Sequence, residues 1–177
     1  MIKEKYGHQM KHHIRFLVMD VDGTLTDGKI QMTSQGELFK SFNTKDGYGI
    51  KDILPLHNII PVIITGRKSD IVTRRAAELN VLEVHQEVYN KAEKMDEILS
   101  RYQNNLTIDK LYQNVAFIGD DLNDLELMKR INQYHGLCGC PQNASTAIKE
   151  ICHFVSKFEG GNGAVRDFIE WIITCIS

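Results

Sequence analysis

Apolar residues fall into short runs along the chain, and polar segments of helical length separate these runs. The runs that predict buried strands are residues 16–19, 61–65, 81–84, 115–119, 136–139 and 153–155. Short runs without polar alternation are typical of strands buried on both faces of a parallel sheet. The segments that predict helices are residues 46–57, 70–79, 91–102, 122–130, 144–151 and the stretch after 163. Because strands and helices alternate, the pattern predicts an α/β protein with a doubly wound, mostly parallel sheet.

A β-hairpin is predicted between the first strand and the first helix. Residues 29–33 and 37–42 flank the segment 34–36, Ser-Gln-Gly, and a short turn with glycine between two strand-like segments is typical of a hairpin. The chain shows no internal repeat, low-complexity tract or linker between domains. The sequence therefore predicts one domain, residues 14–177, after a polar N-terminal tail, residues 1–13.

Composition places this chain among ordinary soluble globular proteins. Apolar residues make up 42% of the 177 residues and charged residues 25%. A net charge of −2 gives no reason to expect nucleic acid or an anionic membrane as a partner. No apolar run is long enough to span a bilayer, and residues 1–13 lack the hydrophobic segment of a secretory signal. We therefore expect a cytoplasmic protein.

Polar residues that could bind a ligand or take part in catalysis follow three of the predicted strands. They are Asp20 and Asp22, then Thr65, Gly66 and Arg67, then Asp120 and Asp121. The carboxyl ends of parallel strands lie at one edge of a sheet, where such folds bind ligands. Residues two apart in an extended chain point the same way, so Asp20 and Asp22 can share one small volume. Two carboxylates so close need a cation or a proton to compensate their charge.

Four segments, in the expected order, resemble the motifs of haloacid dehalogenase (HAD) superfamily phosphatases. They are DVDGTLT at 20–26, Thr65 with the residue after it, Lys91 at the start of a helix, and GDDLND at 119–124. The resemblance implies that Asp20 is the nucleophile that accepts the phosphoryl group and that Asp22 is the general acid and base. It also implies that Mg²⁺ binds the Asp20 and Asp120 carboxylates and the Asp22 backbone carbonyl.

The same motifs imply supporting residues around these groups. Thr65 and the backbone N–H of Gly66 would grip a phosphate oxygen, and Lys91 would place a positive charge on the phosphate and the nucleophile. The residues expected to orient the metal-binding loop are Asp121, Asn123 and Asp124. The 44 residues between Asp20 and Thr65 are already used by a hairpin and a helix, and 28 residues separate Lys91 from Asp120. Neither gap holds a cap domain of about 50 residues or more, so the Rossmann-like HAD sheet is expected to carry the hairpin instead.

A closer resemblance spans about residues 15–173. The segments that carry it are residues 20–28, 42–51, 63–69, 85–91, 119–124 and 159–168. They are similar to the capless HAD subfamily that contains 3-deoxy-D-manno-octulosonate 8-phosphate (KDO 8-phosphate) phosphatase. That subfamily is a homotetramer in which hairpins build a central barrel and a neighbouring subunit roofs each site. The resemblance therefore implies a homotetramer with the tail of one subunit near the site of the next.

The same resemblance implies a set of substrate contacts. Besides Lys91 they are Asn43, Thr44, Lys45, Asp46, Gly47, Lys51, Arg67 and Arg75. Two positions depart from the subfamily pattern. Lys51 stands where arginine is usual, and lysine cannot grip a carboxylate with two parallel hydrogen bonds. Asn162 stands where an arginine is common in the glycine-rich segment near the end of the chain.

The function implied is Mg²⁺-dependent hydrolysis of a phosphorylated 3-deoxy-2-ulosonic acid through an aspartyl-phosphate. The expected substrate is KDO 8-phosphate, whose sugar acid is made for lipopolysaccharide. A nine-carbon analogue, N-acylneuraminate 9-phosphate or KDN 9-phosphate, is the alternative, although relatives that act on the latter tend to replace Arg67. In a phospho-acceptor receiver domain, an acidic pair precedes a phosphorylated aspartate on a later strand. Here the DxD pair follows the first strand and Lys91 precedes GDD at 119–121, so this class is disfavoured. A subunit used only for assembly is disfavoured by the complete set Asp20, Asp22, Lys91 and Asp120.

Overall fold

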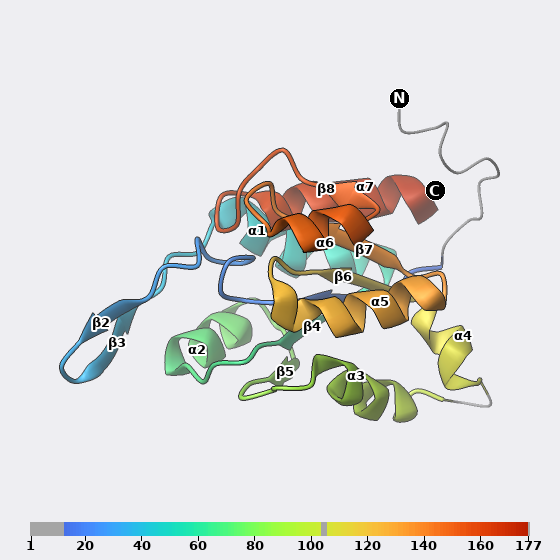
Figure 1. Ribbon diagram of the computed structural model, residues 1–177, viewed down its shortest axis with the longest axis horizontal. Coiled ribbons are helices and arrows are strands. Elements are labelled where there is room, and N and C mark those ends of the chain that lie inside the picture. The colour runs from blue at the N-terminus through green and yellow to red at the C-terminus, as the bar shows by residue number, and fades with distance from the viewer. Residues whose placement is uncertain (1–12, 104–105, 177) are drawn as a thin grey trace.

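A six-stranded parallel sheet forms the centre of the computed structural model, which describes residues 13–103 and 106–176 (Figure 1). Its strand order is β5-β4-β1-β6-β7-β8, and every neighbouring pair runs parallel. The strands are β1 (Phe16–Met19), β4 (Ile60–Ile64), β5 (Glu83–His85), β6 (Val115–Ile118), β7 (Leu137–Cys140) and β8 (Phe154–Val155). The predicted fold class, a doubly wound parallel sheet, is confirmed. Of the predicted N-terminal tail, all but His13 lies outside the described residues.

Helices cover both faces of the sheet. They are α1 (Thr44–Tyr48), α2 (Asp70–Glu78), α3 (Lys91–Ser100), α4 (Ile108–Tyr112), α5 (Leu125–Gln133), α6 (Thr146–Ile151) and α7 (Ala164–Ile176). Side chains alternate between the faces of β1. Leu17 and Met19 pack in one core with α2 and α7, and Phe16 and Val18 pack in a second core with α3, α4, α5 and α6. Two apolar layers therefore hold the strand that leads directly into Asp20.

The segment predicted as one helix over residues 46–57 differs in detail. It consists of α1, one π-helical segment (Gly49–Ile53) and a 3-10 turn (Leu54–His57). Pro55 explains the break, because proline has no N–H to donate and its ring clashes with the carbonyl four residues earlier. The third predicted strand is also shifted, from 81–84 to Glu83–His85, where it pairs with β4 at Val62.

A side chain from a distant part of the chain caps the start of helix α7. Gly163, which precedes α7, offers no side chain to accept the first N–H groups of the helix. The Asp46 carboxylate of α1 accepts from the backbone N–H of Arg166 at 2.7 Å, with further backbone hydrogen bonds from Gly163 and Val165. Asp46 therefore takes the place of an N-cap residue and ties α1 to α7.

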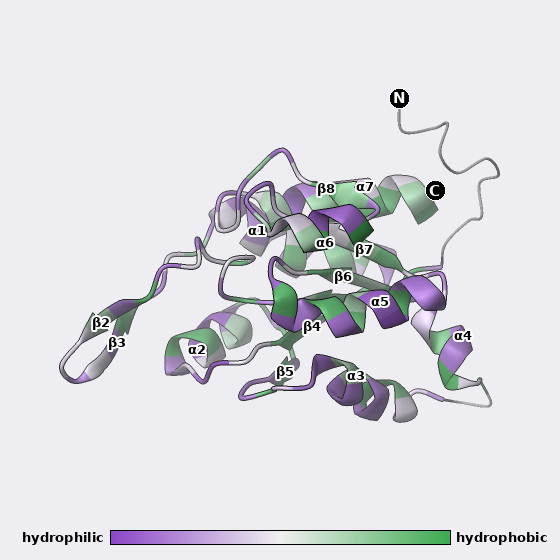
Figure 2. Cartoon of the chain, in the orientation of Figure 1, coloured by the Kyte–Doolittle hydropathy of each residue, from purple (hydrophilic) through white to green (hydrophobic). Residues whose placement is uncertain are grey.

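The predicted hairpin is present as β2 (Gln31–Thr33) and β3 (Gly36–Phe39), and it projects away from the sheet (Figure 1). Hydrophobic residues lie along both of its strands (Figure 2). Met32 is 61% exposed, Leu38 58% and Phe39 47%. Because these side chains are exposed, they are available to a partner. Such a partner would stabilise the hairpin, since an isolated two-stranded hairpin is only marginally stable in water. Among the described residues, no helix combines the length and apolar character needed to cross a membrane.

Candidate active site

The loop after β1 brings two aspartates to the carboxyl edge of the sheet. The Val21 carbonyl accepts from the backbone N–H groups of Thr24, Leu25 and Thr26, which folds the loop into a tight turn. Gly23 has φ +95°, a left-handed conformation that suits glycine, and a Cβ there would lie 2.0 Å from Oδ2 of Asp120. The β1 loop therefore closes directly against the loop after β6.

Lys91 joins three parts of the chain at this edge. It is the first residue of α3, whose N-cap is Asn90. Its Nζ lies 2.7 Å from Oδ1 of Asp20 and 2.5 Å from Oδ1 of Asp124, and its side chain is 1% exposed. Burial acts to lower the pKa of Lys91, but the two carboxylates outweigh it and raise that pKa. Lys91 is therefore a buried, charged ammonium held against the predicted nucleophile.

Three carboxylates cluster around this point. Asp20, Asp120 and Asp124 each offer one oxygen within 4.8 Å of the others, and they form the one such group of metal-binding side chains among the described residues. Burial raises the pKa of Asp20 to about 6, although Lys91 opposes the shift. Burial and the charges of Asp20 and Asp124 raise the pKa of Asp120 to about 7. A divalent cation would compensate the negative charge of these neighbouring carboxylates, and three carboxylates fit a hard ion such as Mg²⁺.

The loop after β6 holds its own shape through Asp124. Its Oδ2 accepts from the backbone N–H groups of Asp120 at 2.9 Å and Asp121 at 3.3 Å, while Asp121 caps the following 3-10 turn. These hydrogen bonds of Asp124 and Asp121 hold the backbone of the loop, and the role of Asp121, Asn123 and Asp124 in orienting it around a metal stays a prediction. Asp124 also lies in the carboxylate cluster itself, which the sequence did not predict. Asn123 is exposed.

Asp22 lies to one side of the cluster and contacts two cations. Its Oδ1 accepts a hydrogen bond from Lys40, and its Oδ2 lies 3.7 Å from Nε of Arg67. The sequence predicted Arg67 as a contact for substrate and gave no sign of Lys40, which comes from the base of the hairpin. That the Asp22 carbonyl binds Mg²⁺ stays a prediction.

Thr65 and Gly66 follow β4, the strand that pairs with β1. The Thr65 N–H donates to the His85 carbonyl at 2.9 Å, and the Thr65 carbonyl accepts from Val88 at 3.1 Å. Thr65 is buried. These bonds fix the end of β4 against the loop before α3, beside the strand that carries Asp20.

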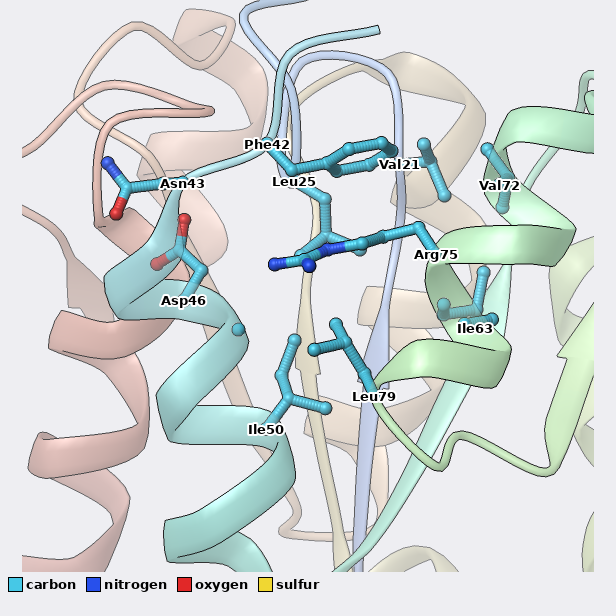
Figure 3. A pocket seen from close by; sticks show the side chains of 12 residues that line it. Val21, Leu25, Phe42, Asn43, Asp46, Ile50, Ile63, Val72, Arg75 and Leu79 are labelled. Atoms are coloured by element: carbon cyan, nitrogen blue, oxygen red, sulfur yellow. The ribbon is translucent and has the colours of Figure 1, made fainter.

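Several of the predicted substrate contacts line a small pocket between α1 and α2, away from the clustered carboxylates (Figure 3). Asn43, Asp46, Gly47 and Arg75 lie here, and none of the clustered carboxylates does. Its cavity of about 10 Å³ has room for roughly one water molecule. Arg75 reaches from α2 towards α1, packs over the Phe42 ring and pairs with Glu78 at 2.8 Å.

The other predicted contacts of this segment are exposed to solvent, and two of the pocket residues cap helices. Thr44, Lys45 and Lys51 are exposed. The Asn43 side chain accepts from the Lys45 N–H at 2.8 Å and caps α1. Asp46 caps α7, as described above. Within one chain the Asn43 and Asp46 side chains thus have structural partners, and a role of all five residues in binding substrate stays a prediction.

The glycine-rich segment before α7 packs on the β1 loop of the same chain. The Gly161 N–H donates to the Thr24 carbonyl at 3.0 Å, and Gly160 donates to the Asn143 side chain at 3.0 Å. A Cβ at Gly160 would lie 1.8 Å from the Gly23 carbonyl oxygen. The inner side of this segment therefore supports its own nucleophile loop, and its exposed residues, Phe158, Glu159 and Asn162, are the ones free to meet a neighbour.

Comparison with known proteins agrees with the fold and the clustered carboxylates. The sequence profile of the haloacid dehalogenase-like hydrolases matches residues 63–169, more than half of the chain. The chain therefore belongs to the haloacid dehalogenase-like hydrolase family, as its motifs predicted.

Within that family the similarity is to KDO 8-phosphate phosphatases. The enzyme of Salmonella typhi is 37% identical over 161 residues, which are 91% of this chain and 80% of that one. The crystal structure from Yersinia pestis has a TM-score of 0.83 and 35% identity, covering 94% and 84% of the two chains. A structure from Moraxella catarrhalis, which contains magnesium, phosphate and KDO, has a TM-score of 0.82 and 33% identity over 93% and 88%.

Proposed function

We propose that this chain hydrolyses KDO 8-phosphate to KDO and phosphate with the help of Mg²⁺. The buried contact of Asp20 with Lys91, beside the Asp120 and Asp124 carboxylates, carries the proposal. It provides a nucleophile, a cation that holds the nucleophile, and oxygen ligands for a metal. The relatives named above, two of them crystal structures, support the choice of substrate.

The chemistry needs a nucleophile, a proton donor and positive charge on the transferring oxygens. Asp20 attacks phosphorus while the bond from phosphorus to the sugar oxygen breaks, and Asp22 gives its proton to that oxygen. Asp22 then takes a proton from water, which attacks the aspartyl-phosphate and releases phosphate from Asp20. Lys91 holds the Asp20 carboxylate in place throughout. Mg²⁺, held by Asp20 and Asp120 with the Asp22 carbonyl, would supply further positive charge to the phosphate oxygens.

The sugar acid itself must be recognised by groups around the mouth of the site. Arg67 is half-exposed and lies beside Asp22, so it can reach a substrate held there. Lys51 and Asn162 replace arginines that are usual in the subfamily, and both are exposed. Because these two guanidinium groups are missing, the phosphates of nine-carbon sugar acids, N-acylneuraminate 9-phosphate and KDN 9-phosphate, should be tested as alternative substrates.

We also propose that the protein works as a homotetramer built through its hairpins, with the exposed side of residues 158–162 near the site of the next subunit. The projecting hairpin with its exposed Met32, Leu38 and Phe39 supports this assembly. Residues 14–177 would then act as one domain in each subunit. A cytoplasmic location stays a prediction of the sequence.

A steady-state screen tests the proposed substrate. We expect kcat/KM for KDO 8-phosphate to exceed the values for both nine-carbon phosphates by at least about tenfold, the effect of roughly 1.4 kcal/mol of selective contact. A higher value for either nine-carbon substrate would overturn the assignment. Asp20→Asn should abolish turnover of every substrate while the unfolding midpoint of the protein stays close to that of the wild type. Activity retained in this variant would exclude the covalent mechanism.

A further inference from the structure

Lys40 is a buried lysine between two carboxylates. It follows β3 directly, and its side chain is 2% exposed. A lysine is almost never buried to this degree without partners. Lys40 donates to Oδ1 of Asp22, and its Nζ lies 2.9 Å from Oε1 of Glu37. The base of the hairpin therefore places a positive charge against the predicted acid and base.

Glu37 fixes the other side of this ammonium. Its second oxygen accepts from the Ser69 hydroxyl, and Ser69 caps α2, the helix that follows the loop of Thr65 and Gly66, which is predicted to bind phosphate. The Ser69 backbone N–H donates in turn to Oε1 of Gln86 at 2.6 Å. Lys40 is thus held by a frame that joins the hairpin, α2 and the loop before α3, which leaves its ammonium little freedom to move.

The two cations around Asp22 differ in how firmly they hold it. Arg67 is 47% exposed, and its Nε is 3.7 Å from Oδ2, beyond an ordinary hydrogen bond. Lys40 makes a direct and buried hydrogen bond to Oδ1. Because Oδ1 accepts from an ammonium, the proton of a protonated Asp22 belongs on Oδ2. Oδ2 is the oxygen that faces Arg67 and hence the proposed substrate side.

We propose that Lys40 is a positioning residue, which orients Asp22 so that Oδ2 delivers its proton to the leaving oxygen of the substrate. This inference rests on the role proposed above for Asp22. As the bond from phosphorus to the sugar oxygen breaks, the proton on Oδ2 moves to that oxygen and Asp22 becomes a carboxylate. Lys40 keeps its own protons and compensates the new negative charge through the hydrogen bond to Oδ1.

The choice of leaving group separates positioning from mere support of the fold. KDO 8-phosphate releases a primary alkoxide, which needs a proton, whereas p-nitrophenyl phosphate releases a stabilised phenolate, which does not. The ratio kcat/KM reports the step in which the leaving group departs, so later hydrolysis of the aspartyl-phosphate does not obscure it. General acid catalysis typically contributes about 10²–10⁴-fold.

We expect Lys40→Met to lower kcat/KM for KDO 8-phosphate by about 10–100-fold, part of the full effect of a general acid. For p-nitrophenyl phosphate the loss should stay within about threefold, because no proton is needed there. Equal losses on both substrates would overturn the proposal and leave Lys40 as a structural anchor. If Lys40→Met does not fold, Lys40→Gln, which retains a neutral donor in the frame, allows the same comparison.

Two further variants keep the interpretation unambiguous. Asp22→Asn should show the same preference for the aryl substrate, only larger; without that preference the proposed role of Asp22 fails, independently of Lys40. If Asp22→Asn shows the preference and Lys40→Met does not, only the inference about Lys40 fails. Glu37→Gln keeps the Lys40 ammonium but removes the carboxylate that fixes its other side, so it should show the preference for the aryl substrate to a smaller degree than Lys40→Met. A larger preference in Glu37→Gln than in Lys40→Met would mean that the docked hairpin, and not Lys40, orients the acid.

Discussion

Lys91 Nζ lies 2.7 Å from Oδ1 of Asp20, although 71 positions separate the two residues in the chain. Both side chains are almost fully buried, so the pair is shielded from solvent and salt. Asp124 holds the same ammonium at 2.5 Å, which makes Lys91 the shared counter-ion of two buried carboxylates. Both the stability of the protein and its turnover are expected to depend on this charge balance.

Replacing Lys91 with methionine should damage both stability and turnover. The variant leaves the buried carboxylates of Asp20 and Asp124 without their cation, and breaking a buried pair costs about 3–5 kcal/mol. We expect urea unfolding in EDTA to show a loss of this size, partly reversed by Mg²⁺, and kcat/KM to fall by at least about 10²-fold. Lys94→Met is the control, because Lys94 pairs with Glu97 on the open face of α3. A Lys91→Met protein as stable as this control would contradict the charge balance.

Metal affinity should depend on Asp120 and not on its neighbour. Asp120 belongs to the carboxylate cluster, whereas Asp121 is exposed and caps a turn. EDTA should abolish activity and Mg²⁺ should restore it. Calorimetric titration with Mg²⁺ should show at least about a tenfold weaker Kd for Asp120→Asn and little change for Asp121→Asn. Equal affinities in the wild type and Asp120→Asn would remove Asp120 from the metal site.

The stability of the protein should carry a pH dependence that comes from Asp46. Burial raises the pKa of Asp46 from 3.8 to about 6, although backbone N–H groups of α7 oppose the shift. Between these values the folded protein binds a proton there more tightly than the unfolded chain does, so stability falls as pH rises through this window. The loss of folding stability that comes from burying the charged Asp46 carboxylate is fully present above about pH 6 and is relieved as pH falls towards 4.

Asp46→Asn isolates this effect, because asparagine keeps an oxygen for α7 and carries no charge. Between pH 4 and pH 7 the variant should gain stability relative to the wild type, by on the order of 1–3 kcal/mol. Chemical unfolding of both proteins in EDTA at a series of pH values measures the difference without a contribution from bound metal. The opposite trend would show that attraction of the carboxylate to the start of α7 outweighs the cost of burial.

Charges on the hairpin should dissociate the proposed tetramer. Met32 and Leu38 are 61% and 58% exposed, so replacing both with lysine leaves the fold of each chain intact. In the assembly these positions would lie against other hairpins, where unpaired charges are costly to bury. Sedimentation should give the mass of four chains for the wild type and a smaller mass for the double variant. Leu82→Lys, at a 94% exposed position in the loop before β5, should keep the wild-type mass. An unchanged mass in the double variant would exclude the hairpin as the interface.

Local patterns predicted most of the fold because they act over short distances. The apolar run at 16–19 gave β1 with its bounds, and the turn at 34–36 gave the hairpin. Segments with competing local preferences were less predictable. Pro55 divides a segment with helical periodicity into three kinds of helix, and the third strand moved by one or two residues because pairing with β4 sets its bounds.

Three aspects of the site depended on contacts that no local pattern encodes. Asp124 fits an expected loop-orienting role, yet its side chain also reaches the carboxylate cluster. Asp46 belongs to a segment that resembles a substrate-binding motif, yet its carboxylate caps a helix 120 positions later. Lys40 has no motif around it, and its importance follows from its burial beside Asp22.

The order of strands, helices and acidic strand ends by itself determined the α/β class, the edge at which the site lies and the kind of metal that it suits. These follow from periodicity, from the geometry of parallel sheets and from the preference of hard ions for oxygen. Which cation holds each carboxylate was decided only by the tertiary structure, because burial and distance set the strength of a charge pair and neither is written in local sequence.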